Sequence, residues 1–293
     1  MPKVYGMPYK GSKNKIAKWI VDNLPAGDTL IDVFCGGCAV THAALLSGKW
    51  KNIIINDIDG RMPQLFIDSI NGKYTVENHP EWVTREEFKR KRFTDAQIGL
   101  CWSFGDNCFD YIYGKSKEDL KRALHVAVYN QNLLELASHG IYIERSDEPD
   151  IYKRYQNYHK QVKKYISNDR GIQHLESLHR LESLQELRGV PGVDRLKISS
   201  VDYSEIEIPP GAVLYCDPPY AGTRCGFYTK FDTKRFLQWA RRQKNIYISE
   251  YNMPADFVRL YERQKTVTSA ANNNAMKAVE ALYTNQITAG NTM

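Results

Sequence analysis

Long apolar runs are absent from this 293-residue sequence. A membrane-spanning helix needs about 20 mostly apolar residues in a row, and no stretch of that kind occurs. Residues 1–15 also lack the apolar centre of a secretory signal peptide. We therefore expect a cytoplasmic protein that has no membrane partner.

Cysteine is sparse, with six thiols at positions 35, 38, 101, 108, 216 and 225. Their scatter along a long chain predicts reduced thiols and argues against a disulfide framework. Cys35 and Cys38 have the spacing of a zinc-ligand pair, but no second pair of cysteines or histidines stands at ligand spacing. We expect no metal site.

No segment carries a large excess of one charge. The chain has 40 basic and 34 acidic residues, which gives a net charge of +6. This mildly basic balance is compatible with a polyanionic partner, but many unrelated enzymes share it. Any contact with a polyanion must therefore come from local clusters.

Strand and helix patterns alternate near both ends of the chain and predict an α/β sheet. Buried strands are expected within 29–34, 51–59, 195–203, 212–220, 245–251 and 280–286, and helices within 15–25, 36–48 and 234–243. Residues 75–195, in the middle of the chain, are polar and mostly helical in pattern, and they have leucines at every third position from 175 to 187. We predict one sheet domain from residues 1–74 and 196–293, interrupted by a mainly helical insertion at 75–195.

A glycine-rich turn, DVFCGGC at 32–38, follows the first expected strand. Such a turn lets a ligand approach the backbone at a helix N-terminus. Asp57, at the end of the next strand, is placed to accept hydrogen bonds from a ribose diol. The simpler interpretation is a surface turn capped by Asn56 and Asp57. The spacing favours a nucleoside cofactor but does not separate NAD from S-adenosylmethionine.

The stretch VLYCDPPY at 213–220 is the most informative one, because a buried strand runs directly into an acid, two prolines and a tyrosine. Proline cannot continue a central strand, so this tetrad must lie just past the strand end, where open α/β sheets bind ligands. Asp217 and the Pro218 carbonyl are acceptors that could each take one hydrogen of a nucleobase amine. Tyr220 offers a flat face on which the base could stack.

With these motifs the chain resembles the Dam-like family of adenine-N6 DNA methyltransferases, found in bacteria and phages. YKGSK at 9–13 resembles the N-terminal cofactor motif, DVFCGGC the glycine turn, INDID at 55–59 the ribose-binding acid, VDY at 201–203 the acid near the cofactor's adenine, and DPPY the catalytic tetrad. The resemblance covers about residues 5–70 and 196–285. It implies a Rossmann-like S-adenosylmethionine-dependent methyltransferase sheet, with 75–195 where the family keeps its target-recognition domain.

The resemblance assigns roles to particular residues. It implies that catalysis rests on Asp217, Pro218, Pro219 and Tyr220. It implies that S-adenosylmethionine is held by Tyr9, Lys13, Asp32, Phe34, Gly36, Asp57, Asp202 and Asp217, with Lys13 pairing with the cofactor's carboxylate. Lys13 could instead be an exposed lysine of a basic N-terminus, and Asp202 could be a simple cap at a strand end.

Two cysteines bear on this site. Cys38 stands where the family pattern has its second glycine, and two alternatives stay open there: the turn tolerates a small side chain, or the side chain strains the backbone and weakens cofactor binding. Cys216 adjoins the tetrad, but no covalent nucleophile is needed, because an amine can attack a sulfonium methyl directly.

Two basic clusters are candidates for binding double-stranded DNA while the target adenine is flipped out of the helix. The first interleaves lysines with tyrosines over 151–166 and includes Lys160, Lys163 and Lys164. A solvated amphipathic helix with inward tyrosines explains that pattern equally well. The second follows the tetrad and includes Arg224 and Lys230.

The sequence therefore predicts a site-specific DNA adenine methyltransferase that acts as a monomer. We expect it in the cytoplasm of a bacterial cell or of a phage-infected host, and we expect it to take part in restriction-modification. Three alternatives stay open: methylation of cytosine N4, methylation of adenine in RNA, and a catalytically silent nucleic-acid-binding module. Asp217 disfavours the first, because families acting on cytosine usually have serine in that position.

Overall fold

The computed structural model describes residues 3–219, 231–268 and 275–290. The chain forms two compact units. The first unit contains residues 1–6, 11–64 and 189–293, and the second contains residues 7–10 and 65–188. Each unit has its own hydrophobic core.

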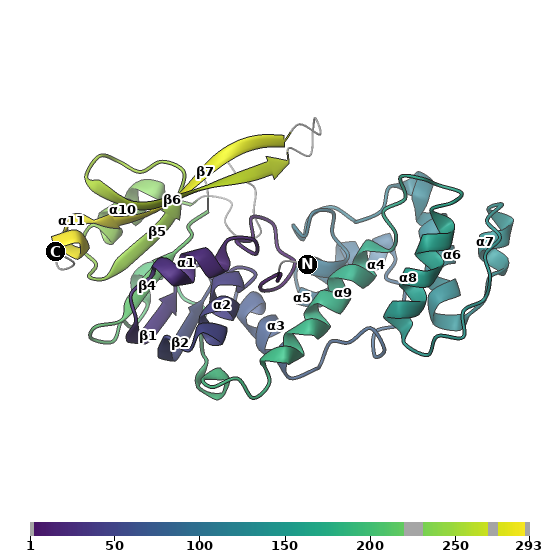
Figure 1. Ribbon diagram of the computed structural model, residues 1–293, viewed down its shortest axis with the longest axis horizontal. Helices are drawn as coiled ribbons and strands as arrows, with labels where there is room; N and C mark the ends of the chain where they lie inside the picture. Colours follow the sequence, from purple (N-terminus) through teal and green to yellow (C-terminus); the bar gives the residue numbers. More distant parts are fainter. Residues whose placement is uncertain (1–2, 220–230, 269–274, 291–293) are drawn as a thin grey trace. The chain divides into compact units, whose positions relative to one another are not determined.

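The first unit is built on a seven-stranded sheet with the order β3-β2-β1-β4-β5-β7-β6 (Figure 1). The strands are β1 (Gly27–Asp32), β2 (Trp50–Asn56), β3 (Lys197–Ser199), β4 (Val213–Cys216), β5 (Ile246–Glu250), β6 (Phe257–Thr268) and β7 (Ala275–Asn285). The first five strands pair in parallel, and β7 is antiparallel to both β5 and β6. The expected Rossmann-like α/β fold is confirmed.

Helices of the first unit flank this sheet. They are α1 (Ala17–Asn23), α2 (Ala39–Ser47), α10 (Thr233–Ala240) and α11 (Gln286–Gly290), with the short 3-10 helices η2 (Val193–Arg195) and η3 (Tyr203–Glu205). A further helix, α3 (Arg61–Ile70), begins in the first unit and ends in the second. All four residues of β4 are buried, which is why its sequence is a continuous apolar run.

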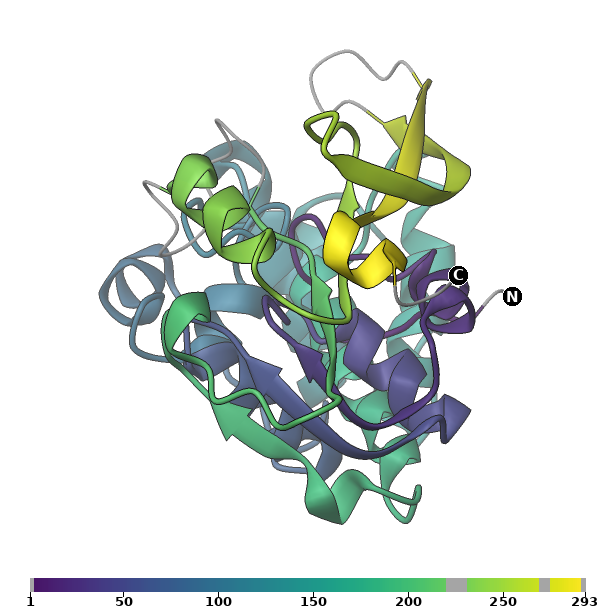
Figure 2. The same ribbon diagram turned by 90° about the vertical axis from the view of Figure 1, so that its left-hand side faces the viewer.

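A long antiparallel pair, β6 with β7, closes one edge of the sheet. The sequence pattern predicted only a final strand at 280–286. It did not predict β6, because the many charged residues of β6 hide the alternation of a half-buried strand. β5 pairs with β7 only at residues 281–283, whereas β6 pairs with β7 along residues 275–285. Figure 2 shows this pair in yellow tones, continuing past the shorter strands.

The second unit is helical among its described residues. Its elements are α4 (Arg85–Lys91), α5 (Ala96–Cys101), α6 (Lys115–Asn130), α7 (Leu134–Ser138), α8 (Ile151–Val162), α9 (Gln173–Glu182) and the 3-10 helix η1 (Ser183–Leu187). The side chains of Thr84, Asp95 and Asp150 cap α4, α5 and α8 by accepting a backbone N–H.

The leucine repeat of 175–187 has a simple explanation in this unit. On an α-helix a three-residue repeat drifts around the axis, so the sequence predicts packing on more than one side. The structure changes from α9 to the 3-10 helix η1 at Ser183, and a 3-10 helix has three residues per turn. Leu184 and Leu187 therefore stay on one face, and all five leucines are buried.

Candidate active site at the carboxyl ends of the parallel strands

Four acidic residues stand at the ends of parallel strands. Asp32 is the last residue of β1, Asp57 follows β2, Asp217 follows β4, and Glu250 ends β5. Parallel strands end at the same edge of a sheet, so these carboxyl groups gather there. Asp32 and Asp57 are each only 1% exposed, whereas the Asp217 side chain keeps 19% of its surface open.

A buried ammonium group lies among these acids. Lys13 Nζ donates to Asp217 Oδ1 at 2.7 Å and lies 3.6 Å from Glu280 Oε1. The Lys13 side chain is 3% exposed, so it is not the surface lysine that the sequence left open. The structure brings Lys13 to the acid of the tetrad; a contact between Lys13 and a cofactor carboxylate stays a prediction.

Glu280 on β7 is a member of this cluster that sequence reasoning missed. Its carboxylate is completely buried and accepts a hydrogen bond from Ser249 Oγ of β5 at 2.8 Å. One signal was available, because Glu280 is an acid inside the apolar run VEALY. A buried carboxylate needs such partners, and Ser249 and Lys13 supply them.

Burial changes the protonation of two of the acids. Burial raises the pKa of Asp32 to about 7, a hydrogen bond from Thr41 opposes the rise, and the negative charges of Asp217 and Asp57 add to it. Burial likewise raises the pKa of Glu250 to about 7. Near neutral pH both groups are therefore only partly ionised.

The glycine turn between β1 and α2 is closed by Asp57. Gly36 N–H donates to Asp57 Oδ2 at 2.9 Å, and Asp59 N–H donates to Asp57 Oδ1 at 2.9 Å. Gly36 has a φ of +44°, in the left-handed region. Asp57 therefore holds the turn in shape, a role that its strand-end position alone did not predict.

The N-terminal segment presses its backbone against this turn at Gly6. The Gly6 N–H donates to His42 Nδ1 at 3.0 Å. A Cβ at Gly6 would lie 2.4 Å from the Gly37 carbonyl oxygen and 2.7 Å from the Ala39 Cα, distances that real side chains do not reach. Only glycine fits here, although no motif in the sequence marks Gly6.

Cys38, the departure from the family pattern, has a φ of +54° and precedes α2 as its N-terminal cap residue. Left-handed backbone costs a residue with a Cβ about 1–2 kcal/mol. Of the two alternatives that the sequence left open, the backbone angle agrees with strain at this position. The side chain is fully buried, and its thiol lies 3.8 Å from the Gly36 carbonyl oxygen.

Phe34 and Asp202 have partners of their own in the structure. Phe34 packs in an aromatic group with Tyr203, Phe231 and Phe236, at ring distances of 5.6 to 5.7 Å. Asp202 caps η3 and pairs with Arg235 at 3.0 Å. These contacts match the strand-end cap that the sequence left open for Asp202, and its contact with a cofactor stays a prediction.

The remaining predicted site residues fall into three groups. Pro218 is buried and Pro219 half-buried beside Asp217. Tyr220, Arg224 and Lys230 lie outside the described residues. Tyr9, half-buried, and the exposed Lys160, Lys163 and Lys164 belong to the second unit.

Two absences hold for the described part of the chain. No group of three His, Cys, Asp or Glu side chains there is arranged to hold a metal ion. No helix there has both the length and the apolar character needed to cross a membrane. The five described cysteines are buried free thiols.

Comparisons with known proteins agree with this geometry. The family model described as D12 class N6 adenine-specific DNA methyltransferase matches residues 9–285. The chain is 22% identical to the Type II methyltransferase M2.HphI of Haemophilus parahaemolyticus, over 90% of this chain and 81% of that protein. The solved rRNA methyltransferase AviRa of Streptomyces viridochromogenes aligns with 92% of this chain and 82% of its own, at 12% identity and a TM-score of 0.33. At that TM-score the fold assignment rests on the strand order itself.

Proposed function

The chain belongs to the D12 class N6 adenine-specific DNA methyltransferase family, and on this premise we propose that it transfers a methyl group from S-adenosylmethionine to the N6 amine of an adenine at a specific site in double-stranded DNA. The observation that carries the proposal is the buried acid cluster around Asp217, with Lys13 on one of its oxygens. The specificity for one DNA site is proposed by analogy with the type II relative.

Charge favours S-adenosylmethionine over NAD as the ligand of this cluster. Five carboxyl groups, those of Asp32, Asp57, Asp217, Glu250 and Glu280, gather around the ammonium of Lys13. The pyrophosphate of a dinucleotide would meet like charge there, whereas a sulfonium and an α-ammonium group would meet opposite charge. The glycine turn held by Asp57 supports the same cofactor, with Asp57 as the partner of its ribose.

When bound, S-adenosylmethionine supplies a methyl group on a positively charged sulfur, which an amine can attack directly. The chain's own contribution is to hold that amine. Asp217 is an acceptor and Pro218 has a carbonyl but no N–H, so each could take one hydrogen of the N6 amine. Lys13 stabilises the negative charge on Asp217 and fixes its orientation through Oδ1.

The target base must leave the DNA stack before its amine can reach Asp217. Eversion costs a few kcal/mol, and stacking on an aromatic ring returns about 1–3 kcal/mol. We propose Tyr220 as that ring. Once the base is in place, catalysis is chiefly the positioning of nitrogen against methyl carbon.

Methylation of DNA by the purified chain tests the proposal. With methyl-labelled S-adenosylmethionine and unmethylated duplex DNA, we expect label in DNA and N6-methyladenine as the labelled nucleoside. N4-methylcytosine, or label in RNA alone, would replace the proposal with one of the other methylations. Absence of label from both nucleic acids would favour a catalytically silent module.

Affinity for S-adenosylmethionine should rise with pH. Asp32 and Glu250 have a pKa of about 7 in the free protein, so they are mostly neutral below that pH, and a cationic ligand binds best when they are ionised. The affinity should therefore be about tenfold weaker near pH 6 than near pH 8 for each of the two that must ionise.

Titration calorimetry at several pH values measures this dependence. An Asp32→Asn variant keeps a side-chain oxygen for Thr41 but cannot ionise, so its affinity should change less with pH. A wild-type affinity that is flat between about pH 6 and pH 8 would contradict the coupling between these acids and the ligand's charge.

A further inference from the structure

An extended segment of the second unit, residues 142–146, is fastened along α8 and the turn after it. The Tyr165 hydroxyl donates to the Tyr142 carbonyl at 2.6 Å. The Gln161 amide pairs with both backbone groups of Glu144, at 2.8 and 3.2 Å. Asn157 Nδ2 donates to Ser146 Oγ at 3.2 Å. The segment therefore runs antiparallel to the helix.

The spacing of these contacts fits an extended segment that lies beside a helix. Residues 142, 144 and 146 of the segment contact residues 165, 161 and 157 of α8 and the turn after it, so two residues of the segment correspond to four residues of the helix. Two extended residues span about 6.6 Å and four helical residues about 6 Å. The two repeats match, so successive hydrogen bonds form without bending either chain.

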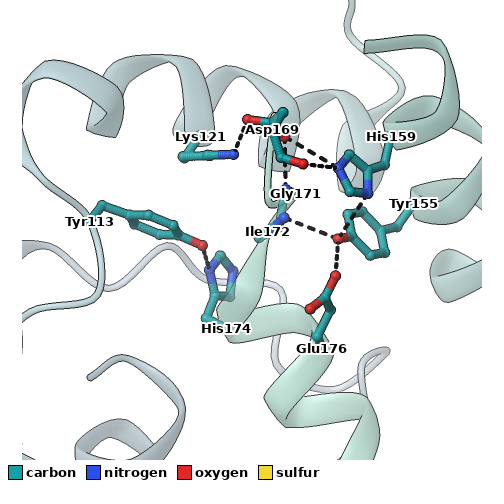
Figure 3. A network of polar contacts seen from close by, with 9 residues as sticks. All are labelled: Tyr113, Lys121, Tyr155, His159, Asp169, Gly171, Ile172, His174 and Glu176. Atoms are coloured by element: carbon teal, nitrogen blue, oxygen red, sulfur yellow. Dashed lines mark hydrogen bonds and ion pairs between the residues drawn. The ribbon is translucent and has the colours of Figure 1, made fainter. Parts of the chain in front are cut away.

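The opposite face of α8 is fixed to its neighbours in the core. Figure 3 shows Asp169 between Lys121 of α6 and His159 of α8, and the Tyr155 hydroxyl donating to Glu176 of α9. Tyr155 is 2% exposed. The simpler interpretation, in which the tyrosines of the helix pack inward, is thus correct for the inner face of α8. These contacts with α6 and α9 hold the helix whose outer face is exposed.

A groove opens between the segment and the helix, which we call the α8 groove. Its cavity of about 340 Å³ is lined by Asn157, Lys160, Gln161 and Lys164 from the helix side and by Tyr142, Glu144 and Tyr165 from the other. A volume of about 300 Å³ or more is typical of a site for a small ligand group.

The α8 groove combines unpaired positive charge with exposed aromatic rings. No acidic group of the described residues forms an ion pair with Lys160, Lys163 or Lys164, whereas Lys153 on the same helix pairs with Asp150. Tyr142 is 71% exposed and Tyr165 is 49% exposed. The carboxylate of Glu144 is one negative charge against the two lysines that line the groove.

A second cavity on the other side of Tyr165 has a different character. It measures about 390 Å³ and is lined by Asp119 and His139, with no lysine or arginine. A polyanion would meet no permanent positive charge there. Of the two cavities, charge complementarity selects the α8 groove for a negatively charged partner.

We propose that the α8 groove binds the sugar–phosphate backbone of the substrate DNA, with Lys160 and Lys164 on phosphates and Tyr142 against the backbone beside them. This rests on the proposed function, because that function makes duplex DNA the polyanion. Lysines neutralise phosphates and tyrosines contact phosphate and sugar in protein–DNA interfaces. The hydrogen bonds of residues 142–146 hold the backbone that carries Tyr142 before DNA arrives, so the backbone adds little ordering cost on binding.

The salt dependence of DNA binding tests this contact. The experiment uses the full chain and an unmethylated duplex oligonucleotide. The logarithm of affinity falls linearly with the logarithm of salt concentration, and replacing both Lys160 and Lys164 by glutamine should make this fall less steep by about 1.8, since each phosphate contact contributes about 0.9. Tyr142→Ala should weaken binding about tenfold with little change of slope, because it removes an uncharged group.

Lys153→Gln is the matched control, since Lys153 is an exposed lysine of the same helix outside the groove. Its slope should equal that of the wild type. A wild-type slope in the Lys160 and Lys164 double variant, or an equal loss in the Lys153 variant, would overturn the groove as a contact site. Failure of the proposed function is a different result, in which the wild-type chain transfers no methyl group to DNA at all.

Discussion

Replacing Asp217 with alanine should lower the rate of methyl transfer to DNA by about 10³-fold, the effect of removing one preorganised partner of a reacting group. The fold should survive the change. Lys13 would lose its partner at 2.7 Å but would keep Glu280 at 3.6 Å, so the buried ammonium is not left without a counter-charge. Single-turnover methyl transfer and thermal unfolding measure the two effects separately.

Asp256→Ala is a suitable control for this experiment. Asp256 is also an acid of the first unit and forms an ion pair with Arg241, but that pair lies at the surface. Solvent screens an exposed pair, so its loss should change the free energy of unfolding little and leave the transfer rate unchanged. A wild-type rate in the Asp217 variant would remove this carboxylate from the mechanism.

Gly6→Ala should be among the most destabilising single-methyl additions in the chain. The new Cβ would be forced against the Gly37 carbonyl oxygen and the Ala39 Cα, both of which are backbone atoms that cannot rotate away. Crowding of this kind costs about 1–3 kcal/mol, and left-handed backbone adds about 1–2 kcal/mol. The free energy of unfolding should fall by about the sum, and ligand affinity should fall as the glycine turn shifts. Urea denaturation and cofactor titration measure the two losses.

Gly48→Ala separates crowding from backbone strain. Gly48 has a φ of +64°, close to the +69° of Gly6, but a Cβ there would meet nothing within 4 Å. This variant should lose only the strain of about 1–2 kcal/mol. Equal losses in the two variants would show that close packing of the N-terminal segment on the turn is unimportant.

Most of the parallel part of the sheet was predictable because β1, β2, β4 and β5 are short strands rich in buried apolar residues, whereas the three residues of β3 are exposed or half-buried. β4 is the clearest example, since four buried residues run into two prolines. β6 was not predictable in the same way. Its residues from Arg259 to Thr266 are mostly polar, and it forms through its pairing with β7, which no local pattern reveals.

The site shows the same division. Asp57 and Asp217 could be selected because strand ends in an α/β sheet are marked in the sequence, whereas Asp32 was selected through the family resemblance. Gly6 could not be selected, since its importance comes from contacts with residues far away in the chain. For Glu280 the sequence offered one signal, an acid inside an apolar run, but its partner Lys13 is known only from the structure. Lys13 was selected through the family resemblance, and only the structure gives its contact with Asp217.

The contact between Lys13 and Asp217 joins positions 204 residues apart, and Glu280 is later still. A ribosome adds about 5–20 residues per second, so the lysine emerges many seconds before either acid. A nascent chain therefore has no complete acid cluster until β7 has left the ribosome. Methyl transfer to DNA must wait for almost the whole of translation, and a prematurely terminated chain that lacks β7 should be inert.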